Sequence, residues 1–211
     1  MPSIVVFASG SGSNFQAVID AARSGRIPAS VAGLITDREG IRAIERAREA
    51  GIPVRVIPPG EQPGRQNFAG ALLDALNTWK PDLVVLAGYL RRIPPSVIRR
   101  YPGRIINIHP ALLPDFGGEG FYGMRVHRAV LEAGRETSGC TVHRVTENYD
   151  EGPILEQVTV PVHPCDTPET LAARVLEKEH ELLPRVIRNL LEGERSSASG
   201  NSAAPSSQSQ S

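Results

Sequence analysis

Asn107 and His109, two residues apart, are the side chains best suited to chemistry on a carbonyl group. They stand in Arg104–Pro114, which runs from a strand-like apolar stretch into a loop. Side chains alternate along a strand, so these two point the same way. An amide N–H can stabilise an oxyanion, and an imidazole can give or take a proton near neutral pH. The pair predicts a site where negative charge builds on a carbonyl oxygen; the alternative is a strand-end histidine with a purely structural role.

The glycine-rich stretch Gly10–Asn14 is a second candidate, because it follows the first apolar run and opens the first helical pattern. Amide groups at a helix N-terminus, reinforced by the helix dipole, suit a phosphate. The stretch is not a P-loop, because it lacks Gly-Lys-Ser/Thr. Phe15 stands where the dinucleotide fingerprint has its third glycine, although Asp37 partly mimics that fingerprint's ribose-binding acid. The alternative is a tight turn whose glycines only satisfy backbone geometry.

Several of these segments resemble the folate-dependent formyltransferases. Asn107–Pro114 is similar to their signature Asn-x-His-Pro-x-Leu-Leu-Pro. Asp150, in Tyr149–Pro153, matches the second signature, an aspartate in a loop followed by a glycine. Leu86–Ile93 matches the segment that holds the pterin of the folate, and Gly10–Asn14 matches the phosphate loop of the members that act on glycinamide ribonucleotide. The matches occur in the family's order and run from residue 3 to about residue 192.

The resemblance implies transfer of the formyl group of 10-formyltetrahydrofolate, a co-substrate, to the amine of glycinamide ribonucleotide in purine biosynthesis, without a metal. It implies His109 as the acid/base, Asn107 as the oxyanion partner and Asp150 as the carboxylate that keeps His109 charged. The residues implied to bind the ribonucleotide are Gly12, Ser13, Asn14 and Glu179. Those implied to contact the folate are Arg65, Leu90, Arg91, Arg92, Ile93 and Asn107. The alternative for Arg91 and Arg92 is a solvated basic turn.

Glu179 also stands out from the residues alone, because it falls on an apolar helical stripe between Val175 and Leu182. A carboxylate that faces inward is costly unless it is paired. The alternative is a helix twisted enough to leave Glu179 in solvent. His143 is placed near the expected site. The remaining histidines are interpreted as surface or packing residues: His127, His163 and His180.

The elements that must position these residues follow a βαβα rhythm. Continuous apolar runs are typical of strands covered on both faces, and they occur at Ile4–Ala8, Val31–Thr36, Val54–Ile57, Leu83–Ala87 and Ile105–Ile108. Amphipathic segments between them predict helices at Phe15–Ser24, Ile41–Ala50, Gln66–Trp79 and Pro95–Tyr101. This rhythm predicts an α/β, Rossmann-like formyltransferase fold with a mostly parallel, twisted sheet.

The last part of the chain departs from this rhythm. Thr141–Thr146 and Ile154–Val160 are joined by a short loop, which predicts an antiparallel hairpin. A long final helix opens at the N-cap Thr167, is expected to kink at Pro184, and is expected to end at Gly193. We therefore expect a formyltransferase domain over 1–193 and a disordered Ser-rich tail over 194–211. The glycine-rich link at 115–126 is expected to be mobile, as an active-site flap is.

Composition limits the partners. The 211 residues include 23 basic and 23 acidic side chains, so no broad nucleic-acid surface is expected. No apolar run reaches a membrane span and no signal peptide is recognised, so a cytoplasmic setting is the default. The two cysteines, Cys140 and Cys165, have no metal-ligand spacing. The expected partners are the two small substrates, and the oligomeric state is open.

Two rival functions deserve comparison. One is another enzyme of the same fold, which would form formylmethionyl-tRNA or hydrolyse formyltetrahydrofolate. The first kind carries a C-terminal domain where this chain has a short polar tail, and the second carries an N-terminal regulatory domain where this chain begins its first strand at once. The other rival is a non-catalytic nucleotide-binding module, which has no need for Asn107, His109 and Asp150 together.

Overall fold

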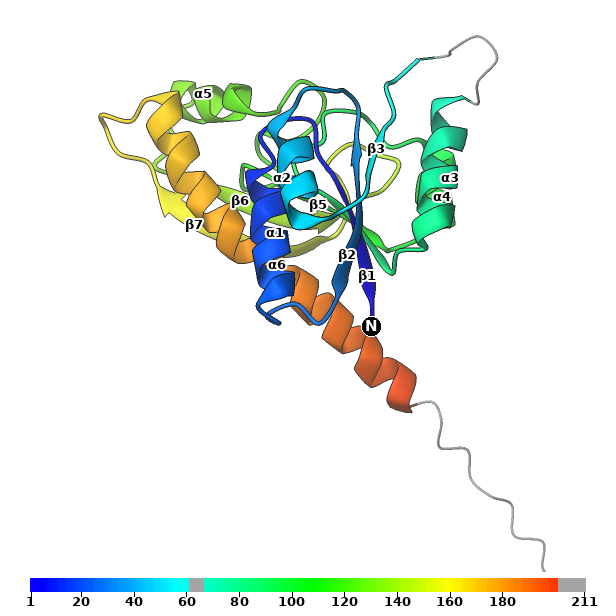
Figure 1. Cartoon of the computed structure of the whole chain (residues 1–211). Helices are drawn as coiled ribbons and strands as arrows, with labels where there is room; N and C mark the ends of the chain where they lie inside the picture. The colour runs from blue at the N-terminus through cyan, green and yellow to red at the C-terminus, as the bar shows by residue number, and fades with distance from the viewer. Residues whose placement is uncertain (61–66, 201–211) are drawn as a thin grey trace, which may run out of the picture.

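A single seven-stranded sheet forms the centre of the molecule, in the order β3-β2-β1-β4-β5-β6-β7 (Figure 1). The computed structural model describes the backbone of residues 1–60 and 67–200, and side chains up to residue 193. The first five strands are mutually parallel, and β6 and β7 continue the sheet antiparallel. The parallel strands are β1 Ser3–Phe7, β2 Ser30–Thr36, β3 Val54–Val56, β4 Leu83–Leu86 and β5 Ile105–His109. The predicted fold class is confirmed.

Two apolar clusters cover the two faces of the sheet, because alternate residues of each strand point to opposite sides. Ile4 and Val6 of β1 face one cluster, whereas Val5 and Phe7 face the other. The first cluster includes buried residues of α1, α2, α5 and α6, and the second includes those of α3 and α4. The first four helices are α1 Ser13–Arg23, α2 Arg42–Ala50, α3 Phe68–Trp79 and α4 Pro95–Arg100. Each lies where the amphipathic pattern predicts it.

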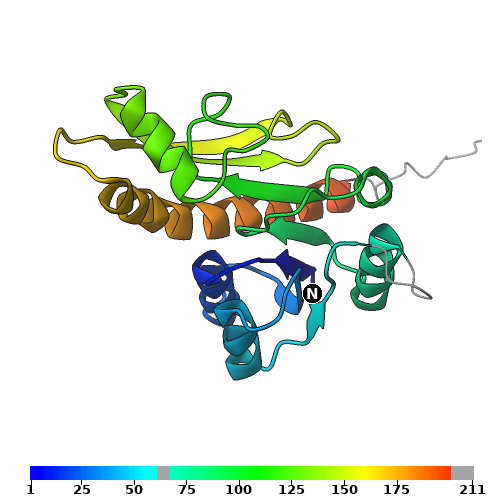
Figure 2. The same ribbon diagram turned by 90° about the horizontal axis from the view of Figure 1, so that it is seen from above.

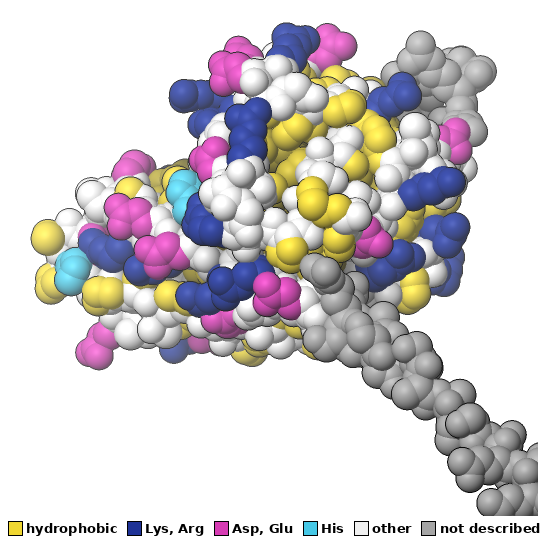
Figure 3. All heavy atoms as spheres, turned by 60° about the horizontal axis from the view of Figure 1, so that its bottom comes forward, with side chains coloured by type: hydrophobic (Ala, Val, Ile, Leu, Met, Phe, Trp, Pro, Cys, Tyr) yellow, Lys and Arg dark blue, Asp and Glu magenta, His cyan; other side chains and the backbone are white. Residues whose placement is uncertain are grey.

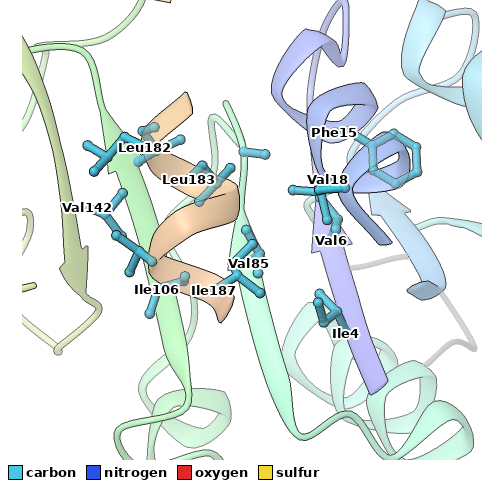
Figure 4. Close-up of a cluster of buried hydrophobic side chains, with 14 of the residues drawn as sticks. Ile4, Val6, Phe15, Val18, Val85, Ile106, Val142, Leu182, Leu183 and Ile187 are labelled. Atoms are coloured by element: carbon cyan, nitrogen blue, oxygen red, sulfur yellow. The ribbon is translucent and has the colours of Figure 1, made fainter. Parts of the chain in front are cut away.

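The C-terminal part adds the hairpin and the longest helix. Strands β6 Thr137–Arg144 and β7 Ile154–Pro161 form the expected hairpin, although β6 starts before Thr141. Helix α6, Pro168–Gly200, packs on both strands and reaches α1 (Figure 2). Its side chains Leu182, Leu183 and Ile187 join the first apolar cluster opposite Val85, Ile106 and Val142 of the sheet (Figure 4).

The ends of α6 test two predictions. The start is confirmed: the Thr170 N–H donates to Thr167 Oγ1 at 3.3 Å, and Pro168 is the first helical residue. The expected end at Gly193 is wrong, because the helix continues to Gly200. A glycine inside a helix costs about 1 kcal/mol relative to alanine, but it does not by itself end the helix. The backbone of 194–200 is therefore helical where a disordered tail was expected, and residues 201–211 lie outside the described residues.

The link at 115–126 is shorter than expected, because helix α5, Met124–Glu132, starts inside it, and its mobility stays a prediction. Val126, His127 and Val130 form the buried face of this short helix. Pro184 lies inside α6, as its sequence position requires, and the kink expected there stays a prediction. In the part of the chain that the structure describes, no helix is long and apolar enough to cross a membrane.

Candidate active site

A cavity of about 440 Å³ opens at the carboxyl ends of β1, β4 and β5. The strand order reverses direction between β1 and β4, and open α/β sheets bind their ligands at such a point. The loop after β1, the loop after β4, the end of β5, the start of α5, the β6–β7 loop and one face of α6 all contribute to its lining. The cavity brings together Gly12, Ser13, Asn14, Leu90, Asn107, His109, Asp150 and Glu179.

The glycine-rich loop forms one end of the cavity, and Gly12 is essential to its shape. Gly12 is the N-cap of α1 and has a φ of +70°, a left-handed conformation that favours glycine. A Cβ at this position would lie 2.7 Å from the Cβ of Ala43 in α2. No side chain caps the helix, so its first amides depend on some other partner. At Gly10, by contrast, an added Cβ would meet nothing within 4 Å.

Glu179 lies at the same end of the cavity and is buried, with 7% of its surface exposed. The Asn14 side-chain amide donates to Glu179 Oε2 at 2.6 Å. The predicted inward orientation is confirmed, and the alternative of a solvated carboxylate is wrong. Burial raises the pKa of Glu179 to about 7, and the hydrogen bond from Asn14 only partly opposes that shift. The Asn14 Oδ1 atom is buried and has no hydrogen-bond partner among the residues that the structure describes.

His109 and Asp150 form the centre of the other end. His109 Nε2 lies 2.8 Å from the carbonyl oxygen of Phe116, which can only accept, so this nitrogen carries a hydrogen. His109 Nδ1 lies 3.6 Å from Asp150 Oδ2. Burial lowers the pKa of His109, and Asp150 and the Phe116 carbonyl offset this only in part. The pKa of His109 is therefore below its usual value, because desolvation outweighs a carboxylate at this distance, and the expectation that Asp150 keeps His109 charged stays a prediction.

His143 is a further member of this cluster. Its Nδ1 lies 3.0 Å from the Arg144 carbonyl oxygen and therefore carries a hydrogen. In the neutral ring Nε2 then accepts, and the side-chain amide of Asn107 donates to it at 3.1 Å. The same Nε2 lies 3.5 Å from Asp150 Oδ1. His143 thus fixes which way the Asn107 amide faces, and leaves its second N–H for another acceptor.

Asp150 is held in an uncommon backbone conformation, with a φ of +56°. The Gly118 N–H donates to Asp150 Oδ2 at 3.0 Å. Burial raises the pKa of Asp150, but the contact with His143, the electrostatic interaction with His109 and this N–H together lower it by more, so its pKa falls below the usual value. A Cβ on Gly152 would collide with the Arg144 carbonyl oxygen, which explains why a glycine follows the aspartate.

The link between Pro114 and His127 turns out to be part of this cluster. Its Phe116 and Gly118 backbone groups contact His109 and Asp150, as described above. His127, interpreted from the sequence as a surface or packing residue, is buried and lines the cavity. Burial and the nearby His109 lower its pKa to about 4, and its Nδ1 has no partner within the described residues. In the sequence, the apolar face of α5 could have indicated that His127 is buried, but the glycines before this helix indicated a loop.

The loop that follows His109 is fixed by Thr141 of β6, which the sequence interpretation did not single out. Thr141 Oγ1 donates to the Ala111 carbonyl oxygen at 2.6 Å and accepts from the Leu113 N–H at 3.1 Å. Gln157 of β7 donates to the same hydroxyl at 2.8 Å. The antiparallel strands thus orient the loop that carries the signature residues.

The segment after β4 forms one wall of a smaller hollow of about 50 Å³, which Asn107, His143 and Asp150 also line. Leu90 is exposed at the cavity mouth and Ile93 is buried. Arg92 donates to the backbone carbonyl of Glu147. Arg65, the remaining residue implied to contact the folate, lies outside the described residues.

Arg91 is exposed, but it is anchored to the fold. Its Nε donates to Asp37 Oδ2 at 2.8 Å, and Arg38 Nη2 donates to the same oxygen at 2.7 Å. Although burial raises the pKa of Asp37, hydrogen bonds from Arg38, Ser9 and Arg91 lower it to about 2. Asp37 partly mimics a ribose-binding acid in the sequence, but its carboxylate is already hydrogen-bonded to these two arginine side chains. Among the described residues no group of three or more His, Cys, Asp or Glu could hold a metal ion.

Comparisons with known proteins point in one direction. Residues 3–187 match the formyl transferase family. The phosphoribosylglycinamide formyltransferase of Escherichia coli (strain K12) is 38% identical over 90% of this chain and 88% of its own length. The chloroplastic enzyme of that name from Arabidopsis thaliana is 45% identical over 90% of this chain, which spans only 65% of the plant protein. The crystal structure of glycinamide ribonucleotide transformylase 1 from Symbiobacterium toebii superimposes with a TM-score of 0.85, at 45% identity, covering 92% of this chain and 89% of that one.

Proposed function

The chain belongs to the formyl transferase family, and we propose that it transfers the formyl group of 10-formyltetrahydrofolate to the amine of glycinamide ribonucleotide. The products are formylglycinamide ribonucleotide and tetrahydrofolate, and the reaction is a step of purine biosynthesis. One observation carries the proposal: a single cavity joins an uncapped helix N-terminus at one end to an Asn–His–Asp cluster at the other. A substrate with a phosphate at one end and a nucleophile at the other would contact both ends of this cavity.

At the phosphate end, backbone amides of Gly12, Ser13 and Asn14 hold the phosphate of the ribonucleotide. Their position at the start of α1 supports this role, because an anion supplies the cap that the helix lacks. Glu179 and Asn14 face the cavity together and suit the hydroxyl groups of a ribose, as paired acceptor and donor.

At the reactive end, His109 acts first as a base. Neutral in the free protein, it takes a proton from the ammonium group of the ribonucleotide and becomes charged beside Asp150. The freed amine attacks the formyl carbon, and its oxygen becomes an oxyanion that Asn107 and protonated His109 stabilise. The new C–N bond forms in this attack, and the bond to the folate nitrogen breaks when the oxyanion collapses to the new formamide. The amine's second proton passes to that departing nitrogen, and His109 returns its own proton to solvent.

The folate occupies the hollow beside the segment after β4. That hollow is lined by Arg91, Arg92, Ile93 and Asn107, and Leu90 lines the larger cavity, which supports their proposed contacts with the folate. Arg65 stays a prediction. Because Asn107 and Asp150 line both this hollow and the larger cavity, they stand where the two substrates meet.

The proposed partners are these two small molecules, with no metal, nucleic acid or membrane, in the cytoplasm. On the face shown in Figure 3, basic and acidic side chains are interspersed, which gives no single-sign field for a polyanion. Hydrolysis of formyltetrahydrofolate and formylation of methionyl-tRNA are less favoured, because the relatives described above carry the ribonucleotide enzyme's name at 38% and 45% identity.

A coupled absorbance assay tests the proposal by following tetrahydrofolate formation from 10-formyltetrahydrofolate. We expect turnover that depends on glycinamide ribonucleotide. Equal turnover without any acceptor would instead indicate a hydrolase, and turnover only with methionyl-tRNA would indicate the tRNA enzyme. Absence of all three activities, with binding retained, would favour a nucleotide-binding module.

A further inference from the structure

The phosphate end of the cavity has a charge imbalance, which matters because a ribonucleotide phosphate carries up to two negative charges. The described lining of the whole cavity contains two acidic side chains, Glu179 at this end and Asp150 at the other, and no lysine or arginine. Helix amides supply only about half a positive charge. A cation just behind the lining would therefore contribute strongly to phosphate binding, if the fold places one there.

Arg46 of α2 is placed in that position. Its Nε donates to the carbonyl oxygen of Ser11 at 2.9 Å, and its Nη1 donates to Gln16 Oε1 of α1 at 3.0 Å. Helix α2 is itself joined to the loop, because the Ala43 N–H donates to the Gly10 carbonyl oxygen at 3.2 Å. The guanidinium group is thus anchored to the backbone of the phosphate loop from behind.

No described carboxylate forms an ion pair with Arg46. Arg38, Arg91 and Arg174, by contrast, each form one. Its side chain is half-buried, so solvent screens its field less than that of an exposed arginine. Arg46 therefore projects a positive field through the loop toward the cavity.

The hydrogen bond to Ser11 adds a second effect. The Ser11 carbonyl and the Gly12 N–H belong to one peptide unit, and donation to the oxygen polarises that unit. The Gly12 N–H then becomes a stronger donor to an anion. Since Gly12 lines the cavity, the strengthened N–H donor lies where the phosphate is proposed to bind.

We propose that Arg46 is a positioning residue that determines phosphate affinity, acting through the Ser11–Gly12 peptide and through its own charge. The inference rests on the proposed function, because it names the group that recognises one part of that substrate. It predicts selective loss of phosphate-dependent binding, with little effect on the chemistry at His109.

The test compares Arg46→Gln with Arg48→Gln, on the same helix. Arg48 is exposed and two residues away, so it faces the opposite side of α2. We expect Arg46→Gln to raise the KM for glycinamide ribonucleotide roughly 10- to 100-fold, the range for a lost charge-assisted hydrogen bond. The KM for 10-formyltetrahydrofolate and kcat should change less than about threefold, and Arg48→Gln should resemble the parent protein.

Three further measurements separate phosphate recognition from a structural role. The inhibition constant of inorganic phosphate should rise by the same factor in Arg46→Gln. Binding of glycinamide riboside, which lacks the phosphate, should be unchanged. The salt dependence of phosphate binding should weaken in Arg46→Gln, whereas Arg46→Lys, which keeps the charge, should retain most of it.

Equal losses for the phosphorylated and unphosphorylated ligands, or an unchanged inhibition constant for phosphate, would overturn the proposal. If Arg46→Gln does not fold, Arg46→Lys and a Gln16→Leu variant, which removes one anchor but keeps the charge, provide the same comparison. The proposed function can fail separately: in that case the parent protein would show no turnover, while calorimetric titration of inorganic phosphate would still decide the role of Arg46.

Discussion

The two ends of the cavity are built on different principles. The phosphate end relies on backbone: helix amides, a left-handed glycine and a carbonyl held by Arg46. The reactive end relies on titratable side chains, in which Asp150 lies between His109 and His143. Substitutions at the first end should therefore act through shape and stability, whereas substitutions at the second should act through proton positions. The predictions below test that distinction, in order of decreasing effect.

Replacing Asp150 with asparagine should have the largest effect. It keeps the size of the side chain but removes the charge that raises the pKa of His109, so that pKa should fall still further below its usual value. Protonation of His109 during the reaction then becomes less favourable, and kcat should drop by roughly 10²-fold or more. The KM for the ribonucleotide should change little.

A pH–rate profile together with NMR titration of His109 checks this prediction. The limb of the pH–rate profile that reflects the ionisation of His109 should move to lower pH in the variant. An unchanged imidazole pKa would show that Asp150 does not tune His109, even if activity is lost.

Glu179 is the exception at the phosphate end, because it titrates. Its pKa is raised from 4.5 in the unfolded chain to about 7 in the folded protein. The protonated carboxyl therefore favours folding below pH 4.5, and that contribution is lost as pH rises through about 7. We expect Glu179→Gln to be more stable than the parent at pH 8, by roughly 2–3 kcal/mol relative to their difference at pH 4, since one pKa unit is worth about 1.4 kcal/mol.

Urea unfolding of both proteins across this pH range measures the effect. All other titratable groups are common to both proteins, so their contributions cancel in the difference. A difference that does not change with pH would show that Glu179 has the same pKa in the folded and the unfolded protein.

Gly12→Ala should act through shape. The new Cβ would lie 2.7 Å from Ala43 Cβ on a backbone with a φ of +70°, so a loss of roughly 1–2 kcal/mol is expected from the strain alone. The melting temperature should fall by several degrees, with a raised KM for the ribonucleotide and an unchanged pH profile. A shifted pH profile would contradict the prediction that substitutions at the phosphate end do not act through proton positions.

Gly10→Ala is the matched control and should show the smallest effect. Its Cβ meets nothing within 4 Å and its φ is not positive, so stability should change by less than about 0.5 kcal/mol. A higher KM for the ribonucleotide, without lost stability, would show that the phosphate approaches the loop closely at this point. Thermal melts and steady-state kinetics on the same preparation measure the changes in stability and in the KM.

The sequence predicted what local pattern determines. The continuous apolar runs located the five parallel strands, and Asn107, His109, Asp150 and Glu179 all line the predicted site. The sequence did not reveal α5, because it is short and follows Gly117, Gly118, Gly120 and Gly123, which indicate a loop. It also missed the start of β6, where polar Thr137 and Ser138 gave no apolar signal.

Contacts made by backbone atoms or across long sequence separations leave no local signal at all. The Phe116 carbonyl that orients His109 could belong to any residue type. Arg46 shows only an ordinary surface pattern on its own helix, and its role depends on α2 lying beside the first loop. The lowered pKa of His109 likewise follows from burial, which a motif does not report.

The hydrogen bond between Asn14 and Glu179, separated by 165 positions in the chain, also bears on how the protein is made. A chain leaves the ribosome N-terminus first, so α1 and its glycine-rich loop emerge long before α6. Until then, Val6, Val18 and Val85 lack the Leu182, Leu183 and Ile187 side chains that complete their cluster. Although α1 and its glycine-rich loop are synthesised first, the phosphate end of the cavity is thus among the last parts of the newly synthesised protein to reach its final structure.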